Sequence, residues 1–268
     1  MPGRSDRPRF FFAPPAELGR PSFRFPPDEE DHIRRVLRLK AGSIVTAVDG
    51  EGGGARVRLR AEGSALVADV VERFRSSVEP SLRITLAAGL LKGQEMDLVV
   101  ERSAEIGVAV FQPFLSERSV PTGPRARGGR RVARWERLAR SGMKTARGAA
   151  LMEVRPVENL RDLVPLVSLH ERSFLMEREA PPLPRGNPGG NALLLVGPEG
   201  GLADEEKRIL IGAGASPASL GPRNLRAGTA SLAAAVLLLG AGASSDPGFP
   251  SPPGREGEEG SGPEVVEK

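Results

Sequence analysis

Two stretches near the end of the chain each combine an apolar strand-like run, a turn rich in glycine and proline, and a helix-like run. The first, Ala192–Gly201, reads ALLLVGPEGG, and the second, Ser219–Leu239, reads SLGPRNLRAGTASLAAAVLLL. Glycine permits positive φ angles and a close approach of backbone to a ligand, whereas Pro198 fixes φ and removes a donor. Turns at the carboxyl ends of buried parallel strands form the crevice in which open α/β sheets bind ligands. The two stretches therefore predict a ligand site built largely from backbone.

Charged side chains in these turns could supply chemistry. Glu199 belongs to the first turn, and Arg223 and Arg226 belong to the second. A single GPEGG sequence is explained well by a tight turn, but two such turns with two neighbouring arginines favour a functional site. Guanidinium groups can stabilise negative charge that develops on a reacting oxygen. For Glu199 a second interpretation, capping of the following helix, stays open.

The sequence from Arg9 to about Leu239 resembles the bacterial ribosomal RNA small-subunit uridine N3-methyltransferases, which belong to the knotted SPOUT class. That family has a GPEGG loop, matched by Gly197–Gly201, and an LGPR-x-LR segment, matched by Leu220–Arg226. These two motifs together are highly specific. The family's HIxRVLR segment is matched within His32–Leu39.

The resemblance implies a fold and a cofactor. The implied fold class is α/β, with a C-terminal SPOUT-type trefoil-knotted parallel sheet that has helices on both faces, preceded by a small N-terminal PUA-like β-barrel. Composition and periodicity cannot indicate such a knot, because threading is ordinarily absent from proteins. The implied cofactor is S-adenosyl-L-methionine, and the residues expected to bind it are Met176, Val196, Gly197, Pro198, Glu199, Gly200, Gly201, Leu220, Gly221, Leu225 and Arg226.

The implied reaction is methylation at N3 of a uridine in 16S ribosomal RNA of the small ribosomal subunit. Uridine N3 is a poor nucleophile until its proton leaves, and a cation at the uracil carbonyl oxygens would stabilise the resulting anion. Arg226 and Arg223 are the candidates for this cation, and Arg118 is a weaker one. Glu199 is the candidate to orient the cofactor or to receive the proton. The family also implies a homodimer whose active site borrows residues from both subunits.

The sequence departs from the family in two places. Relatives usually have Thr-Glu-Thr after the LR pair, whereas Ala227-Gly228-Thr229 stands here, so a carboxylate is absent. Relatives usually have Glu-Gln four and three residues before the arginine matched by Arg147, whereas this chain has Met143-Lys144. Either change could alter substrate positioning or weaken catalysis, and the missing glutamate is the more serious. A catalytically weak or inactive RNA-binding relative is therefore an alternative.

Length and composition set limits on the class of protein. At 268 residues the chain is long enough for one or two domains. It has no cysteine and only two histidines, which excludes disulfides and leaves a zinc site almost no ligands. We expect no metal. The longest apolar run, Ala230–Leu239, is about half a membrane span, and no signal peptide is visible, so we expect a cytoplasmic protein without membrane contact.

The N-terminal part, residues 1–76, has short strand patterns separated by turns, with one helix among them. Strands are predicted at Phe10–Phe12, Ser43–Val48, Ala55–Leu59 and Leu66–Glu72, a spacing that favours a small β-barrel. A helix is predicted over Asp28–Leu39, with Ile33, Val36 and Leu37 on its inward face. The arginines on the other face could be merely solvated, but the family match makes RNA phosphate their expected ligand. The residues expected to contact RNA are Arg9, Arg34, Arg35, Arg38, Arg118 and Arg147.

After a linker at Ser76–Pro80, residues 80–240 alternate strand and helix patterns, which predicts a parallel sheet. The strands expected are Arg83–Ala88, Val108–Phe114, Glu153–Val157 and Ser173–Met176, and a further one ends at Leu220. The helices expected are Glu95–Ile106, one around Trp135, Asn159–Val167, Asp204–Ile211, and an apolar final helix that Thr229 can cap. That final helix must be buried in the core or in a dimer interface.

The segment from Arg118 to Arg147 contains ten Arg or Lys residues and one acid, Glu136. Solvated arginines are the ordinary explanation, but this ratio favours an RNA phosphate-contacting surface with salt-sensitive affinity. Trp135 is expected in the core rather than as a base-stacking platform. Residues 1–8 are expected to be a flexible arm, 123–129 a mobile loop, and 241–268 a disordered acidic tail.

Three hypotheses therefore compete: an RNA methyltransferase, an inactive RNA-binding module, and a small-molecule α/β enzyme. The absence of a GxGxxG fingerprint disfavours a Rossmann dehydrogenase, and the basic segment counts against a small-molecule enzyme.

Overall fold

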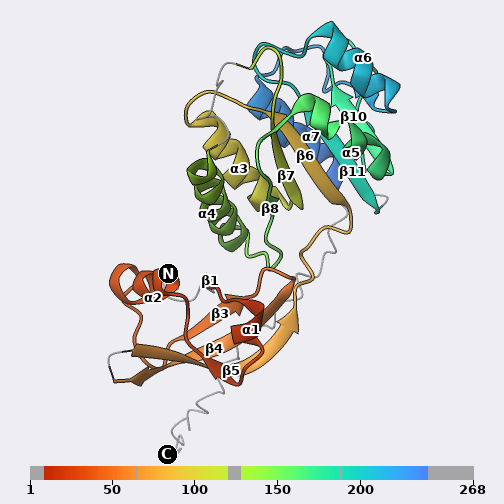
Figure 1. Ribbon diagram of the computed structural model, residues 1–268. Helices are drawn as coiled ribbons and strands as arrows, with labels where there is room; N and C mark the ends of the chain where they lie inside the picture. Colours follow the sequence, from red (N-terminus) through yellow and green to blue (C-terminus); the bar gives the residue numbers. More distant parts are fainter. Residues whose placement is uncertain (1–8, 64, 120–127, 187–188, 241–268) are drawn as a thin grey trace, which may run out of the picture.

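The computed structural model describes residues 9–63, 65–119, 128–186 and 189–240. These residues form two sheets that are joined near residues 76–80 (Figure 1). The predictions for the arm 1–8, most of the loop 123–129 and the tail 241–268 concern residues outside these ranges. Within them, no helix is long and apolar enough to cross a membrane, and no group of His, Asp and Glu could hold a metal ion.

The N-terminal sheet has five strands in the order β1 (Phe10–Phe12), β3 (Ile44–Val48), β4 (Gly53–Glu62), β5 (Ala65–Arg75) and β2 (Ser22–Phe23). The four predicted strands are confirmed. Sequence reasoning missed β2 and α1 (Pro15–Leu18), because elements of two to four residues are too short to have a periodic pattern. The core of this part consists of the inward side chains of the strands together with Ile33.

The predicted helix over Asp28–Leu39 is shorter and less regular than expected. It begins as α2 (Pro27–Asp31), continues as the π-helix η1 (His32–Val36), and ends where Arg38 adopts the left-handed φ of 52°. The wider π turn changes which side chains face the sheet. Ile33 is buried and Leu37 packs against the core, but Val36 is 67% exposed, so its predicted inward position is wrong.

The C-terminal sheet has seven strands, and every pairing in it is parallel, as predicted. The main order is β12 (Ser216–Ala218), β10 (Arg172–Met176), β11 (Asn191–Val196), β6 (Arg83–Gly89), β7 (Val110–Leu115) and β8 (Glu153–Val154), and β9 (Glu158–Asn159) pairs with β7. The last strand therefore ends before Leu220, two residues earlier than predicted.

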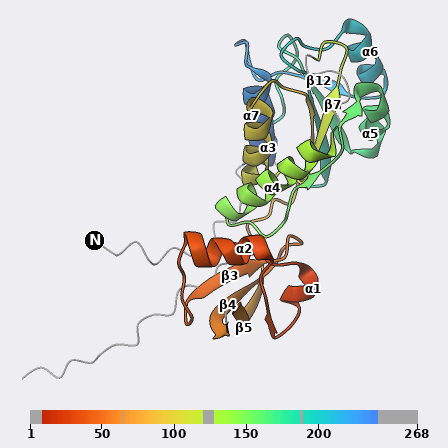
Figure 2. The same ribbon diagram turned by 60° about the vertical axis from the view of Figure 1, so that its left-hand side comes forward.

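Helices cover both faces of this sheet (Figures 1 and 2). One face packs against α3 (Glu95–Ile106), α4 (Gly129–Thr145) and α7 (Ala227–Leu239), and the other against η2 (Leu160–Leu163), α5 (Val164–Leu169) and α6 (Asp204–Gly212). Trp135 of α4 is 1% exposed and donates its indole N–H to Asp97 Oδ1 at 3.0 Å. The prediction that Trp135 is a core residue is confirmed.

The final helix α7 differs from its prediction in two ways. It begins at Ala227 with Arg226 in the cap position, so Thr229 lies inside the helix and does not cap it. One side of α7 is buried against the sheet through Ala234, Ala235 and Leu238, while Val236 on the other side is 52% exposed. An apolar face of α7 is therefore uncovered in the single chain.

The predicted linker is held in place by hydrogen bonds rather than hanging free. Oε1 of Glu79 accepts the backbone N–H groups of Ala149 and Ala150 at 2.6 and 3.1 Å. Residues 149–151 also pair with the turn between β3 and β4. The N–H of Gly52 donates to Ala149 O at 3.0 Å, and the N–H of Leu151 donates to Gly50 O at 2.8 Å. An apolar cluster that we call the joint cluster joins the N-terminal sheet to α4 and the loop after it, and consists of Phe10, Val48, Met143 and Ala149.

Candidate cofactor and RNA site

The loops that follow three adjacent strands of the C-terminal sheet line one cavity. Its volume is about 370 Å³. The loop after β11 contributes Gly197, Pro198, Glu199 and Gly201, and the end of β10 contributes Met176. The chain after β12 contributes the residues from Ser219 to Arg226 other than Pro222. Of the residues predicted to bind the cofactor, those that line the cavity are Met176, Val196, Gly197, Pro198, Glu199, Gly201, Leu220, Gly221, Leu225 and Arg226; Gly200 does not.

Glycines allow the two loops their conformations. Gly201 and Gly221 have left-handed φ angles of 69° and 110°, which other residues rarely adopt. The second loop is also fixed by Ser219, whose hydroxyl donates to Arg178 O at 2.9 Å and accepts the N–H of Gly221 at 3.0 Å. The shape of the cavity is therefore set by backbone geometry and by one serine hydroxyl.

Gly89, at the end of β6, packs directly against the GPEGG loop, and sequence reasoning missed it. A Cβ atom at Gly89 would lie 2.5 Å from the backbone nitrogen of Pro198 and 2.6 Å from its Cδ. Such a distance is well inside van der Waals contact. Only glycine lets β6 and the GPEGG loop approach this closely. The sequence signal was a lone glycine at a strand end, which is too common to single out.

Glu199 does not cap the following helix. Its Oε1 accepts the backbone N–H of Lys92 at 3.3 Å, in the loop after β6. The capping residue is Glu206, whose carboxylate accepts the N–H of Ala203 at 2.9 Å and that of Glu117 at 2.8 Å. The Glu199 carboxylate, which lies on the cavity wall, is thus available for a ligand.

Arg223 and Arg226 are exposed residues on the cavity wall. Within the described ranges neither forms an ion pair with a carboxylate. The other cations at the cavity are neutralised, because Lys207 lies 2.8 Å from Glu177 and Arg178 lies 2.7 Å from Glu179. Arg223 and Arg226 are therefore the cations most free to meet an anionic group there.

Arg118 lies beside the GPEGG loop but outside the cavity wall. Its Nη1 is 3.5 Å from Gly200 O, and a Cβ at Gly200 would be 3.2 Å from the Cβ of Arg118. The buried carboxylate of Glu206 links the loop after β7 to the segment before α6, because it accepts the N–H groups of both Glu117 and Ala203. Arg118 is therefore positioned next to the predicted site.

The other arginines predicted to contact RNA lie on or next to three different elements. Arg34 and Arg35 pair with acids of their own helix, Glu30 and Asp31, each at 3.3 Å. Arg38 follows η1, Arg9 precedes β1, and Arg147 follows α4 with a left-handed φ of 58°. These five arginines therefore lie on or next to η1, β1 and α4, and not on the loops that line the cavity.

The cations of α4 fall into two groups. Arg134 pairs with Asp97 at 2.7 Å, Arg140 with Asp28 at 3.5 Å and Lys144 with Glu29 at 2.6 Å. Arg130, Arg131 and Arg137 form no ion pair with a carboxylate within the described ranges. The basic surface suggested by the sequence is thus narrower than a count of charges indicates.

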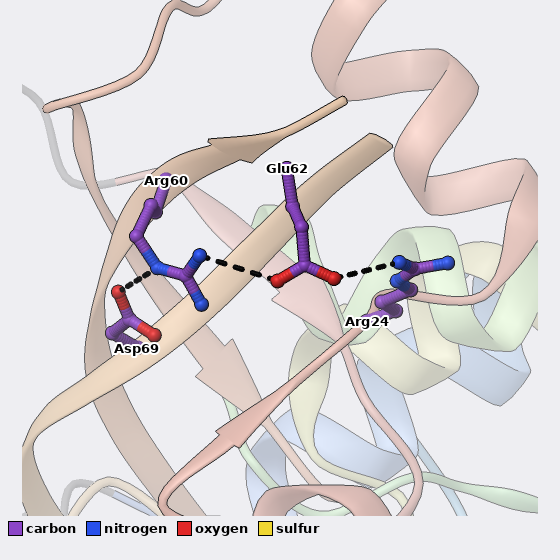
Figure 3. Close-up of polar contacts among 4 residues, drawn as sticks. All are labelled: Arg24, Arg60, Glu62 and Asp69. Carbon is purple, nitrogen blue, oxygen red and sulfur yellow. Dashed lines mark hydrogen bonds and ion pairs between the residues drawn. The ribbon is translucent and has the colours of Figure 1, made fainter. Parts of the chain in front are cut away.

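Arg24 and Arg60 of the N-terminal part are also paired with acids, in the charged network that Figure 3 shows. Glu62 lies between Arg60 and Arg24, at 3.2 and 3.1 Å, and Arg60 also contacts Asp69 at 3.0 Å. Hydrogen bonds from Arg60 and then Arg24 lower the pKa of Glu62, and hydrogen bonds to Asp69 and then Glu62 raise the pKa of Arg60. These arginines are poor candidates for phosphate binding because each already has an acidic partner.

Both departures from the family pattern have a structural setting. Gly228 is buried where α7 crosses α3, and a Cβ there would lie 3.0 Å from Oε1 of Glu95 and 3.1 Å from Cγ2 of Val99. An added Cβ would therefore require Glu95 or Val99 to shift by a few tenths of an ångström, and Gly228 also lines the apolar groove between α3 and α7. Met143 belongs to the joint cluster and Lys144 pairs with Glu29, so this second departure lies between the two sheets.

Residues 78–239, which form the parallel sheet and its glycine-rich cavity, match the family model of the RNA methyltransferase domain. The chain is 31% identical over 229 residues to ribosomal RNA small subunit methyltransferase E of Mycobacterium bovis, covering 80% of this chain and 83% of the relative. It is 26% identical over 223 residues to the protein of that name from Bacillus subtilis, covering 79% of this chain and 87% of the relative.

Solved structures give the same result. A ribosomal RNA small subunit methyltransferase E from Neisseria gonorrhoeae, bound to S-adenosyl methionine, superposes with a TM-score of 0.77 at 28% identity, covering 85% of this chain and 95% of that one. A probable rRNA-methyltransferase from Porphyromonas gingivalis superposes with a TM-score of 0.69 at 29% identity, with the same two coverages. The chain belongs to the ribosomal RNA small subunit methyltransferase E family.

We expect Gly89→Ala to impair the cavity without unfolding the protein. The added methyl group must push the GPEGG loop away from β6, and overpacking of this kind costs about 1–3 kcal/mol, so binding of S-adenosylmethionine should weaken on the order of tenfold or more. Isothermal titration calorimetry measures the affinity. Gly212→Ala is the matched control, because nothing lies within 4 Å of its added Cβ. Equal affinities for Gly89→Ala and the wild type would contradict the close approach.

Proposed function

We propose that this enzyme transfers a methyl group from S-adenosyl-L-methionine to N3 of a uridine in 16S ribosomal RNA of the small ribosomal subunit. The observation that carries the proposal is the single cavity formed by the GPEGG loop and the Leu220–Arg226 loop, with two unpaired arginines on its wall. Relatives that share the family are named for methylation of small-subunit ribosomal RNA. Ribosomal subunits are cytoplasmic, and the protein is expected there with its substrate.

The cavity suits S-adenosylmethionine. Its volume of about 370 Å³ lies in the usual range for small-ligand sites, and its glycine-rich walls offer backbone N–H and C=O groups to adenine and ribose. Gly89 and Gly201 keep side chains out of these walls. When bound, the cofactor supplies an electrophilic methyl group on a sulfonium, so the protein must chiefly align the reactants.

The residues of the cavity then assist the nucleophile. The N3 proton of uridine must leave as the bond from N3 to the methyl carbon forms and the carbon–sulfur bond breaks. Arg226 and Arg223 stabilise the negative charge that develops on the uracil carbonyl oxygens. Glu199 orients the cofactor or receives the proton, and Arg118 assists from the edge of the loop.

A catalytically weak or inactive RNA-binding protein is the second candidate. The observation that favours it is Gly228 in the first turn of α7, where the carboxylate found in relatives is absent. Both candidates predict RNA binding, but only the first predicts methyl incorporation.

The RNA surface is proposed to combine the face of η1 with the first part of α4. Figure 2 shows one end of α4 lying above α2. The cations of these segments are Arg38, Arg130, Arg131 and Arg137, together with Arg34 and Arg35, which would have to give up their partners Glu30 and Asp31. Arg9 and Arg147 would contact RNA at its border.

The finer fold is proposed to be a PUA-like barrel in residues 1–76 and a trefoil knot in 80–240. The knot is supported by the contact between the chain after β12 and the loop after β10. Ser219 N–H donates to Pro181 O at 2.7 Å, and Leu183 N–H donates to Ser219 O at 2.8 Å. An experimental structure traced through 181–226 tests the threading.

The catalytic proposal is tested with Arg226→Ala, labelled S-adenosylmethionine and small subunits from a strain that lacks the gene, followed by mass mapping of the RNA. We expect wild-type enzyme to label one uridine and the variant to lose on the order of a hundredfold in rate, the usual effect of removing one charge-stabilising group. Arg208→Ala, on the exposed face of α6, is the control. Binding without any methyl transfer by the wild type would favour the inactive RNA-binding protein.

The RNA surface is tested by Arg137→Ala. Loss of a phosphate contact should weaken RNA binding and reduce the slope of log affinity against log salt by about one unit or somewhat less. Filter binding at several salt concentrations measures both quantities. Arg60→Ala serves as the comparison, because Arg60 is already held by Asp69 and Glu62. An unchanged salt slope for Arg137→Ala would remove α4 from the RNA surface.

The proposed homodimer is tested at the apolar groove between α3 and α7. This groove is lined by Leu98, Val99, Leu232, Val236 and Leu237, and Leu98 and Val236 are half exposed. Val236→Asp should convert a dimer to a monomer, because a buried unpaired carboxylate costs several kcal/mol. Analytical ultracentrifugation measures the mass, and Leu169→Asp, at an exposed leucine on α5, is the control. A wild-type protein that sediments as a monomer would contradict the dimer.

A further inference from the structure

The contact between the two domains contains an ion pair that neither the cavity nor the RNA surface uses. Nζ of Lys144 in α4 lies 2.6 Å from Oε1 of Glu29 in α2. The Glu29 side chain is 2% exposed and the Lys144 side chain 24%. Lys144 is the one cation within ion-pair distance of Glu29 among the described residues. Because a buried carboxylate without its partner is strongly destabilising, this pair holds α2 to α4.

Contacts next to the Glu29–Lys144 pair favour one orientation of the N-terminal domain relative to α4. Arg140, one turn before Lys144, pairs with Asp28 at 3.5 Å, and its guanidinium lies 4.5 Å from the centre of the Phe12 ring. Met143 is 1% exposed in the joint cluster. The last turns of α4 thus present an apolar residue and two cations to the N-terminal domain, which accepts them with an apolar cluster and two acids. Such a complementary surface favours one orientation over others.

The first part of α4 belongs instead to the RNA surface. The helix runs from the C-terminal sheet down to α2 (Figures 1 and 2), so RNA-facing and domain-facing cations lie on one rigid element. We propose that Glu29 and Lys144 form a domain-orienting pair, which sets the angle at which the N-terminal domain presents RNA to the cofactor cavity. This inference rests on the proposed function. Lys144 is a positioning residue and touches neither cofactor nor RNA.

The angle between the domains matters for catalysis because RNA that contacts both domains is positioned by that angle. A placement error of about 1 Å at a reacting atom reduces rate on the order of a hundredfold. The cavity itself is lined only by residues from Met176 onward, all of them in the C-terminal domain. Loss of the pair should therefore change the use of RNA and leave the affinity for S-adenosylmethionine unchanged.

The pair is tested in the full-length protein with Lys144→Glu and with the exchanged pair Glu29→Lys/Lys144→Glu. Arg208→Glu is the matched control, because it makes the same charge change in an exposed pair within α6, 2.6 Å from Glu205. Trypsin cleavage after Arg75 or Arg83, on either side of the connection, reports opening of the joint. Lys144→Glu should raise the cleavage rate about tenfold or more, and the exchanged pair should restore protection.

Kinetics provide the second measurement. Lys144→Glu should raise KM for small subunits and lower kcat, with the Kd for S-adenosylmethionine unchanged, and the exchanged pair should recover most of the loss. If Lys144→Glu does not fold, Glu29→Gln replaces it, because the amide keeps the shape of the carboxylate. An exchanged pair no better than Lys144→Glu, or unchanged protection and KM in Lys144→Glu, overturns the proposal. If the wild type transfers no methyl group, the proposed function fails, while the cleavage comparison still decides whether the pair holds the joint.

Discussion

The order of the parallel strands is the constraint on which the site depends. Because β10 lies between β11 and β12, the loops that follow these three strands begin side by side, although β10 and β12 are forty residues apart in sequence. The same order puts β6 next to β11, so that Gly89 meets Pro198 at the edge of the cavity. A different order would leave GPEGG as an ordinary turn with no second loop opposite it.

The cavity is made of backbone more than of side chains. Gly201 and Gly221 adopt left-handed φ angles, and the Ser219 hydroxyl bonds the carbonyl of Arg178, two residues after β10. Backbone groups fixed in this way need no rearrangement when a ligand arrives, which reduces the entropy lost on binding. The side chains that do contribute are few, and the two arginines on the wall are those that no described acid neutralises.

Many of the basic side chains in this protein are already paired with acidic ones, so the number of arginines overstates the surface available to RNA. The N-terminal sheet and α4 are rich in arginine, yet Glu62, Asp97, Asp28 and Glu29 each bind one or more of these cations. A paired cation gains less from a phosphate, because its partner must be given up first. The same helix can therefore contact RNA with one part and join two domains with another.

The sequence by itself determined the parallel sheet, the burial of Trp135 in α4, and the pair of glycine-rich loops, because these depend on local periodicity and turn chemistry. Most of the residues expected to bind the cofactor line the cavity, because both motifs are short and continuous, but Gly200 does not. Tertiary structure decided the rest. The π turn that exposes Val36, the approach of β6 to Pro198, and the pairing of Lys144 with Glu29 join residues whose distance in space no local pattern encodes. Those contacts exist only once the chain has packed, because each depends on which elements the fold makes neighbours.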